Sequence, residues 1–135
     1  MESRLNENEA DGPYTRTTSP DGKYVWLADP YEVRMSHYIF VGELWQKSPA
    51  AILLKPADGW SFEQREWTSA TRLQLHGRRY PGSRAGIVMT LDVETKTGMI
   101  ESLPPYSHSL PSPAAPAGAQ PFALLNQWLT DFPND

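Results

Sequence analysis

The sequence predicts a mainly β fold, an antiparallel meander or sandwich that ends in one C-terminal α-helix. Three observations lead to this prediction. Apolar and polar residues alternate over 71–93, turn-forming Pro and Gly residues recur along 13–102, and apolar residues follow helical spacing in 121–133. A chain of 135 residues is large enough for one domain with its own core. The absence of cysteine excludes disulfides, thiolate metal sites and cysteine nucleophiles.

Composition divides the chain into four parts. Residues 1–12 are polar, acidic and aperiodic, which predicts a disordered tail. Residues 13–102 are the expected β domain, 103–120 a connector rich in Pro, Ala and Ser, and 121–133 an amphipathic helix. The chain lacks both an apolar run of the roughly 20 residues that cross a bilayer and a secretory signal, so we expect a cytoplasmic protein without a membrane partner.

The best-specified element is a hairpin in 71–93. Its two halves alternate with a period of two, and the Pro and Gly residues of 80–86 form the loop between them. One face of the hairpin should therefore be buried and the other solvated. The residues expected in the core are Leu73, Leu75, Ile87, Met89 and Leu91.

Turn signals place the other strands. Ser19-Pro20-Asp21-Gly22 is a strong turn, and Asp29-Pro30 is expected to end the strand that follows it. In 60–67, alternation assigns Trp60, Phe62 and Gln64 to one face. Residues 31–45 are the longest uninterrupted β-like stretch. Strands are thus expected at 14–18, 23–28, 31–45, 51–55, 60–67 and 99–102.

The C-terminal helix should begin at Pro121, where a first helical turn tolerates proline. Its apolar stripe comprises Phe122, Leu125, Leu129 and Phe132. A helix of about three turns is marginal alone in water, so it must pack on its own sheet or on a partner. Packing on its own sheet is the simpler expectation.

No catalytic or cofactor motif is present. His37, His76 and His108 fall in different segments and form no metal-binding pair on one helix face. Phosphate loops, nucleophile elbows and EF-hand loops are also absent. We therefore expect a non-enzymatic protein with no cofactor and no metal.

The only basic cluster lies in the central hairpin, where Arg72, Arg78, Arg79 and Arg84 accompany His76 and Tyr80. Arginine beside aromatic residues is typical of single-strand nucleic-acid grooves. Residues 12–102, however, hold ten acidic and eleven basic residues and are nearly neutral, a poor electrostatic footprint for a polyanion. No nucleic-acid partner is expected, and the arginines are expected to line a solvated strand face.

A polar stripe in 32–38 suggests a binding surface instead. Glu32, Arg34 and Ser36 share one parity, and Tyr31, Tyr38 and Phe40 flank them. Arg, Tyr and Trp are enriched at the centres of protein interfaces. The stripe is equally compatible with an ordinary exposed strand face.

Several of these segments resemble a group of small bacterial proteins. They are Ser-Pro-Asp-Gly-Lys-Tyr at 19–24, Glu-Val-Arg-Met-Ser-His at 32–37, Trp60 and Trp67, and Leu-His-Gly-Arg-Arg-Tyr-Pro-Gly at 75–82. The group is that of immunity proteins that protect bacteria against interbacterial toxins, including toxins delivered by type VI secretion. The resemblance covers about 19–93 and leaves out the acidic tail, the connector and the helix.

The resemblance implies a stoichiometric inhibitor that covers a cognate toxin or effector protein. Candidate contacts follow from residue type and expected exposure, and they are Glu32, Arg34, Tyr38, Trp60, Arg78, Arg79 and Tyr80. Two other functions remain open. One is an accessory module whose C-terminal helix inserts into a partner groove. The other is a small ligand-binding or catalytic β-barrel that uses His37 or His76.

Overall fold

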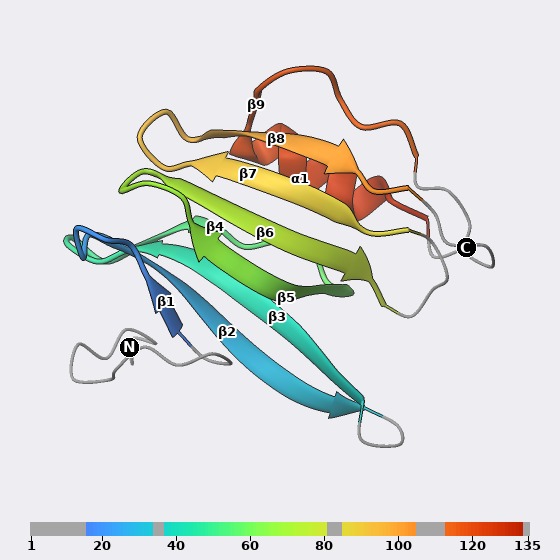
Figure 1. Cartoon of the computed structure of the whole chain (residues 1–135), viewed down its shortest axis with the longest axis horizontal. Helices are drawn as coiled ribbons and strands as arrows, with labels where there is room; N and C mark the ends of the chain where they lie inside the picture. Colours follow the sequence, from blue (N-terminus) through green and yellow to red (C-terminus); the bar gives the residue numbers. More distant parts are fainter. Residues whose placement is uncertain (1–15, 34–36, 81–84, 105–112, 134–135) are drawn as a thin grey trace.

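The computed structural model describes residues 16–33, 37–80, 85–104 and 113–133. It contains two antiparallel sheets and one C-terminal helix, which confirms the predicted fold class (Figure 1). The first sheet has the order β1 (Arg16–Thr18), β2 (Tyr24–Val33), β3 (His37–Gln46), β4 (Ala51–Leu54). The second has the order β5 (Trp60–Trp67), β6 (Arg72–Arg79), β7 (Ile87–Asp92), β8 (Thr97–Ser102), β9 (Gln120–Pro121). Consecutive strands are neighbours, so each sheet is a meander.

The β6–β7 hairpin forms the centre of the second sheet. Leu73 pairs with Leu91 and Leu75 with Met89, so the apolar parity of both strands faces inward. These four side chains and Ile87 are completely buried, which confirms the predicted core face. Burying large aliphatic side chains contributes about 1.5–3 kcal/mol each.

The core joins the two sheets through aromatic rings. Trp26 of β2 meets Phe62 of β5 edge-to-face, with ring centroids 5.5 Å apart. Phe62 stacks on Trp60. The ring centroid of Trp60 lies 4.8 Å from that of Phe132, the first residue after the C-terminal helix. This row of rings therefore runs from the first sheet, through β5, to the C-terminal helix.

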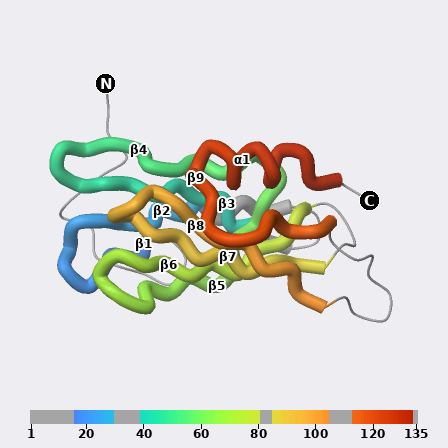
Figure 2. The backbone as a smooth tube through the Cα atoms, turned by 90° about the horizontal axis from the view of Figure 1, so that it is seen from above, coloured from blue at the N-terminus to red at the C-terminus, as the bar shows by residue number. Residues whose placement is uncertain are grey.

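The helix α1 (Phe122–Asp131) packs on the chain's own sheets. Its stripe residues Phe122, Leu125 and Leu129 are buried, and Leu125 lies against Gly98 of β8 where a larger residue would collide with it. Figure 2 shows α1 next to β9 and on the same side of the molecule as β4. The apolar stripe is therefore already occupied. No described helix is long and apolar enough to cross a membrane.

Two of the expected strand boundaries are wrong. β2 continues through Asp29 and Pro30 to Val33, and 31–45 is not one strand, because β3 starts at His37 and pairs back onto β2. Pro30 lies opposite Phe40, whose N–H points away from β2 and donates to Ser61 Oγ. Since this pair is not mutually hydrogen-bonded, the missing proline N–H costs no ladder bond.

A β-bulge corrects the expected facing of β5. The register shifts between Phe62 and Gln64, so that Phe62 points into the core and Gln64 outward. Strict alternation had placed both on one face. The expected disordered tail, 1–12, lies outside the described residues.

Candidate binding site

The β2–β3 hairpin extends well past the strands that flank it. β1 pairs only with 25–27 of β2, and β4 pairs only with 44–46 of β3. Residues 28–33 and 37–43, here called the β2–β3 arm, therefore have no flanking strand among the described residues. Figure 1 shows the outer end of the arm projecting beyond the rest of the molecule, whereas the base of the arm lies beside β5.

One position on each edge of the arm is blocked against pairing with another strand. On the β2 edge, Pro30 has no N–H to offer. On the β3 edge, the N–H of Phe40 donates to Ser61 Oγ at 2.9 Å, and Ser61 is completely buried. These two positions limit how far another strand could pair along either edge of the arm.

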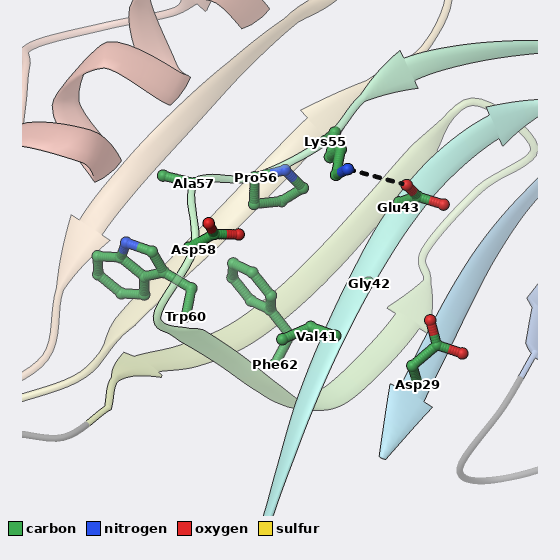
Figure 3. Close-up of a pocket in the computed structure, with 10 residues that line it drawn as sticks. All are labelled: Asp29, Val41, Gly42, Glu43, Lys55, Pro56, Ala57, Asp58, Trp60 and Phe62. Carbon is green, nitrogen blue, oxygen red and sulfur yellow. Dashed lines mark ion pairs between the residues drawn. The ribbon is translucent and has the colours of Figure 1, made fainter. Parts of the chain in front are cut away.

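A pocket of about 370 Å³ lies at the base of the arm, where the β3–β4 ladder separates (Figure 3). Leu54, the last residue of β4, pairs with Leu44. Continuing this register would place Pro56 opposite Gly42, and proline cannot donate to a neighbouring strand. The two chains diverge at that point, and the buried side chains of Trp60 and Phe62 line the inner part of the gap.

The loop that borders the pocket is held by α1. The Asn126 side chain accepts from the N–H of Ala57 at 2.8 Å and donates to the carbonyl of Lys55 at 3.1 Å. One amide side chain thus satisfies two backbone groups of the loop, much as a neighbouring strand would. The C-terminal helix therefore shapes a pocket that lies beside the first sheet.

Four charged residues line the pocket: Asp29, Glu43, Lys55 and Asp58 (Figure 3). Glu43 is buried and accepts from the indole N–H of Trp45 at 3.2 Å. Lys55 Nζ lies 3.9 Å from Glu43 Oε2, and the Lys55 side chain is largely exposed. Because a buried polar side chain loses solvation, these two donors offset part of the cost of burying Glu43.

Behind the pocket, Trp26 lies directly over Gly42. An atom at the Cβ position of Gly42 would overlap the indole ring, so only glycine fits there. Trp26 is completely buried, and its Nε1 has no hydrogen-bond partner among the described residues. A buried donor without an acceptor costs free energy, so the ring is held there by packing.

The structure separates the arginine cluster predicted from the sequence. Arg78 points outward, where its Nε lies 3.3 Å from Glu63 Oε1 and its guanidinium lies 5.5 Å from the ring centre of Tyr80. Arg79, the next residue, faces inward and donates to the carbonyl of Leu129 at 3.1 Å. Arg78 and Tyr80 thus form one surface group, whereas Arg79 stabilises the C-terminal turn of α1.

Trp60 is not an exposed contact residue, and that expectation is wrong. Its side chain is buried, and its Nε1 donates to the carbonyl of Leu129 at 3.0 Å. The helix covers this residue, and nothing in the alternation of β5 signals that a helix from the end of the chain packs there.

Two of the remaining predicted contacts, Glu32 and Tyr38, belong to the arm. The backbones of Glu32 and Tyr38 pair with each other near its tip, and Arg34 lies outside the described residues. The six described candidates therefore fall in three places: Glu32 and Tyr38 are on the arm, Arg78 and Tyr80 are at the surface, and Trp60 and Arg79 face inward. The charged residues that line the pocket were missed. The available signals were a lone acidic residue in the apolar stretch Val41-Gly42-Glu43-Leu44-Trp45 and the Lys55-Pro56 break after β4.

His76 is the histidine whose surroundings the structure describes. His76 lies half-buried on the outer face of β6, paired with Gln64 and Val88. A shallow pocket of about 440 Å³ beside it is lined by polar side chains. No group of three or more metal-ligating residues occurs in the described part of the chain. His37 begins β3, and His108 lies outside the described residues.

Comparisons with protein-family models, with curated proteins and with solved structures gave no match.

Proposed function

We propose that this chain is a non-catalytic binding protein that neutralises a cognate bacterial toxin in a tight one-to-one complex, as immunity proteins do. The observation that carries the proposal is the β2–β3 arm, which projects beyond both flanking strands and bears the pocket at its base. A two-stranded projection of this kind suits insertion into a concave surface such as an enzyme's active site.

The arm has the backbone of a rigid binding element. Its two strands pair without interruption from the body to the Val33–His37 pair near the tip. Ser61 anchors its β3 strand to the second sheet. A hairpin ordered before binding loses less conformational entropy on association, which favours tight binding. Glu32 and Tyr38, two residue types able to form polar and aromatic contacts, occupy opposite positions on it.

The direct test is co-purification with the product of the neighbouring gene and protection of cells from it. A shortened-arm variant makes the test specific: residues 32–38 are replaced by Asn-Gly, so that Tyr31 and Ile39 close a two-residue hairpin. Tyr31 and Ile39 form a mutually hydrogen-bonded pair, because the neighbouring pair, Pro30 and Phe40, is not hydrogen-bonded. A two-residue turn closes best on a hydrogen-bonded pair.

We expect the shortened-arm variant to keep its circular dichroism spectrum and thermal midpoint and to lose toxin binding and protection. The matched comparison is the double variant Arg78→Ala/Tyr80→Ala, which removes the other exposed candidate group. Full protection by the shortened-arm variant would exclude the arm as the toxin-binding element. Failure of the wild-type chain both to bind and to protect would exclude the immunity function.

A further inference from the structure

The open edge of Gly42 faces the pocket. The N–H of Lys47 donates to the carbonyl of Lys23 at 3.0 Å, so the odd-numbered residues of β3 bond to β2. The even-numbered residues then point the other way, as the Phe40–Ser61 bond also shows. Gly42 therefore directs its N–H and carbonyl away from β2, at the point where β4 has ended.

A second backbone carbonyl approaches from the opposite wall. The carbonyl of Lys55 and the N–H of Ala57 both point to Asn126 on α1. In an extended segment the residue between them points the other way, so the carbonyl of Pro56 faces β3 and the pocket. Among the described residues, no loop or side-chain hydrogen bond reaches the carbonyl oxygens of Gly42 and Pro56.

The charges around the pocket add to this excess of acceptors. The carboxylates of Glu43 and Asp58 line the pocket together with one ammonium group, that of Lys55, and Asp29, which has an interaction partner of its own, lies at the β2 side. Glu43 is already engaged with Trp45 and Lys55, so it contributes a negative field more than a direct bond. Asp58 is exposed beside the pocket, where an incoming group can reach it.

A pocket with a backbone carbonyl directed toward it from each wall and with carboxylates in its lining fits a cationic group that only donates hydrogen bonds. A guanidinium has five such donors in a planar fork, whereas an ammonium concentrates its donors at one point. A space of about 370 Å³ accommodates a single long side chain. We propose that the pocket beside Gly42 receives one arginine side chain of the toxin, an inference that rests on the proposed function.

The pocket is tested first without the toxin. The ¹⁵N-labelled chain is titrated with N-acetyl-arginine amide, N-acetyl-lysine amide and N-acetyl-citrulline amide, the last of which is uncharged and nearly the same shape as arginine. We expect the arginine compound to shift the amide signals of Gly42 and Asp58, with an affinity about fivefold or more above that of the citrulline compound. Equal shifts from the two compounds, or none from arginine, would overturn the inference.

Two variants should move the affinity in opposite directions. Asp58→Asn removes a carboxylate beside the pocket and should weaken arginine binding about two- to fivefold. Lys55→Gln removes the only ammonium group lining the pocket and should strengthen it by a similar factor. Glu94→Gln, an exposed change in the turn after β7, is the matched control and should change nothing.

The same variants separate this inference from the proposed function. In the toxin complex, Asp58→Asn should raise the dissociation constant and Lys55→Gln should lower it. A complex that forms with unchanged affinity in both variants would overturn the arginine site and leave the immunity function standing. Absence of any complex would overturn the immunity function alone, because the titration with the arginine compound requires only this chain.

Discussion

Arg79 donates a hydrogen bond from Nη1 to the carbonyl oxygen of Leu129, 3.1 Å away, and thereby ties β6 to the last turn of α1. The helix has no basic residue of its own in that turn. Trp60 donates to the same oxygen, so a carbonyl at the negative end of the helix dipole is satisfied twice from β5 and β6.

Arg79→Ala should therefore lower the free energy of unfolding by about 1–2 kcal/mol, because it removes a charge-assisted bond and half-buried packing. Arg78→Ala is the matched control and should change it by less than about 0.5 kcal/mol, since Arg78 forms an exposed ion pair. Urea denaturation of the two variants measures both values. Equal losses would contradict the inward role of Arg79.

Gly42→Ala should destabilise the protein by about 1–3 kcal/mol, because its methyl group would overlap the indole of Trp26. The added variant Trp26→Phe removes the overlapping ring and also the unpartnered Nε1. In a double-mutant cycle measured by urea denaturation, Gly42→Ala should cost less in the Trp26→Phe background than in the wild type. Strictly additive losses would show that the ring does not cause the effect.

Asn126→Ala should lower the free energy of unfolding by about 1–2 kcal/mol, since it leaves the N–H of Ala57 and the carbonyl of Lys55 without their partner. It should also broaden or shift the amide signals of 55–58, because that loop loses its anchor. Gln127→Ala, whose side chain bonds only within the exposed helix surface, is the control. Unchanged loop signals in Asn126→Ala would mean that the ladder, and not the helix, positions the loop.

The turn before β2 should make stability depend on pH in acid. The pKa of the Asp21 carboxyl is lowered chiefly by the N–H of Lys23 and next by the hydroxyl of Ser19, which both donate to it. A carboxyl with a depressed pKa in the folded state stabilises the fold above its unfolded-state pKa. This contribution disappears as pH falls through the folded-state pKa.

The urea midpoint of the wild type should therefore fall more steeply between about pH 5 and pH 2 than that of Asp21→Asn. Asparagine retains an acceptor oxygen for the Lys23 N–H and removes only the titration. Parallel pH profiles for the two proteins would assign the acid sensitivity to other carboxyls.

The parts of the fold that could be predicted are those for which the residue pattern of a single strand is sufficient. Leu73, Leu75 and Met89 alternate with polar residues, and the period of a strand alone places them on one face. Pro30 was misread as a strand end because its effect depends on which edge of β2 bears the proline. That edge is set by the pairing with β3, which no single segment reveals.

The candidate site was predicted only in part. Two of the arm residues, Glu32 and Tyr38, were identified by residue type, and the structure places them opposite each other. The residues of the pocket were not identified, because Gly42, Lys55 and Asp58 come from different segments of the chain. They line one pocket only because the β3–β4 ladder ends there. Asn126, which holds that loop, comes from the far end of the chain.

The sequence by itself determined that the chain is mainly β, which face of the β6–β7 hairpin is buried, and that a helix follows the proline-rich connector. These properties follow from local periodicity and local backbone preference. Only the tertiary structure decided that Arg78 faces solvent while Arg79 holds α1, and that a pocket opens beside Gly42. Strand register and the packing of the helix decide both, and each depends on contacts between residues far apart in the chain.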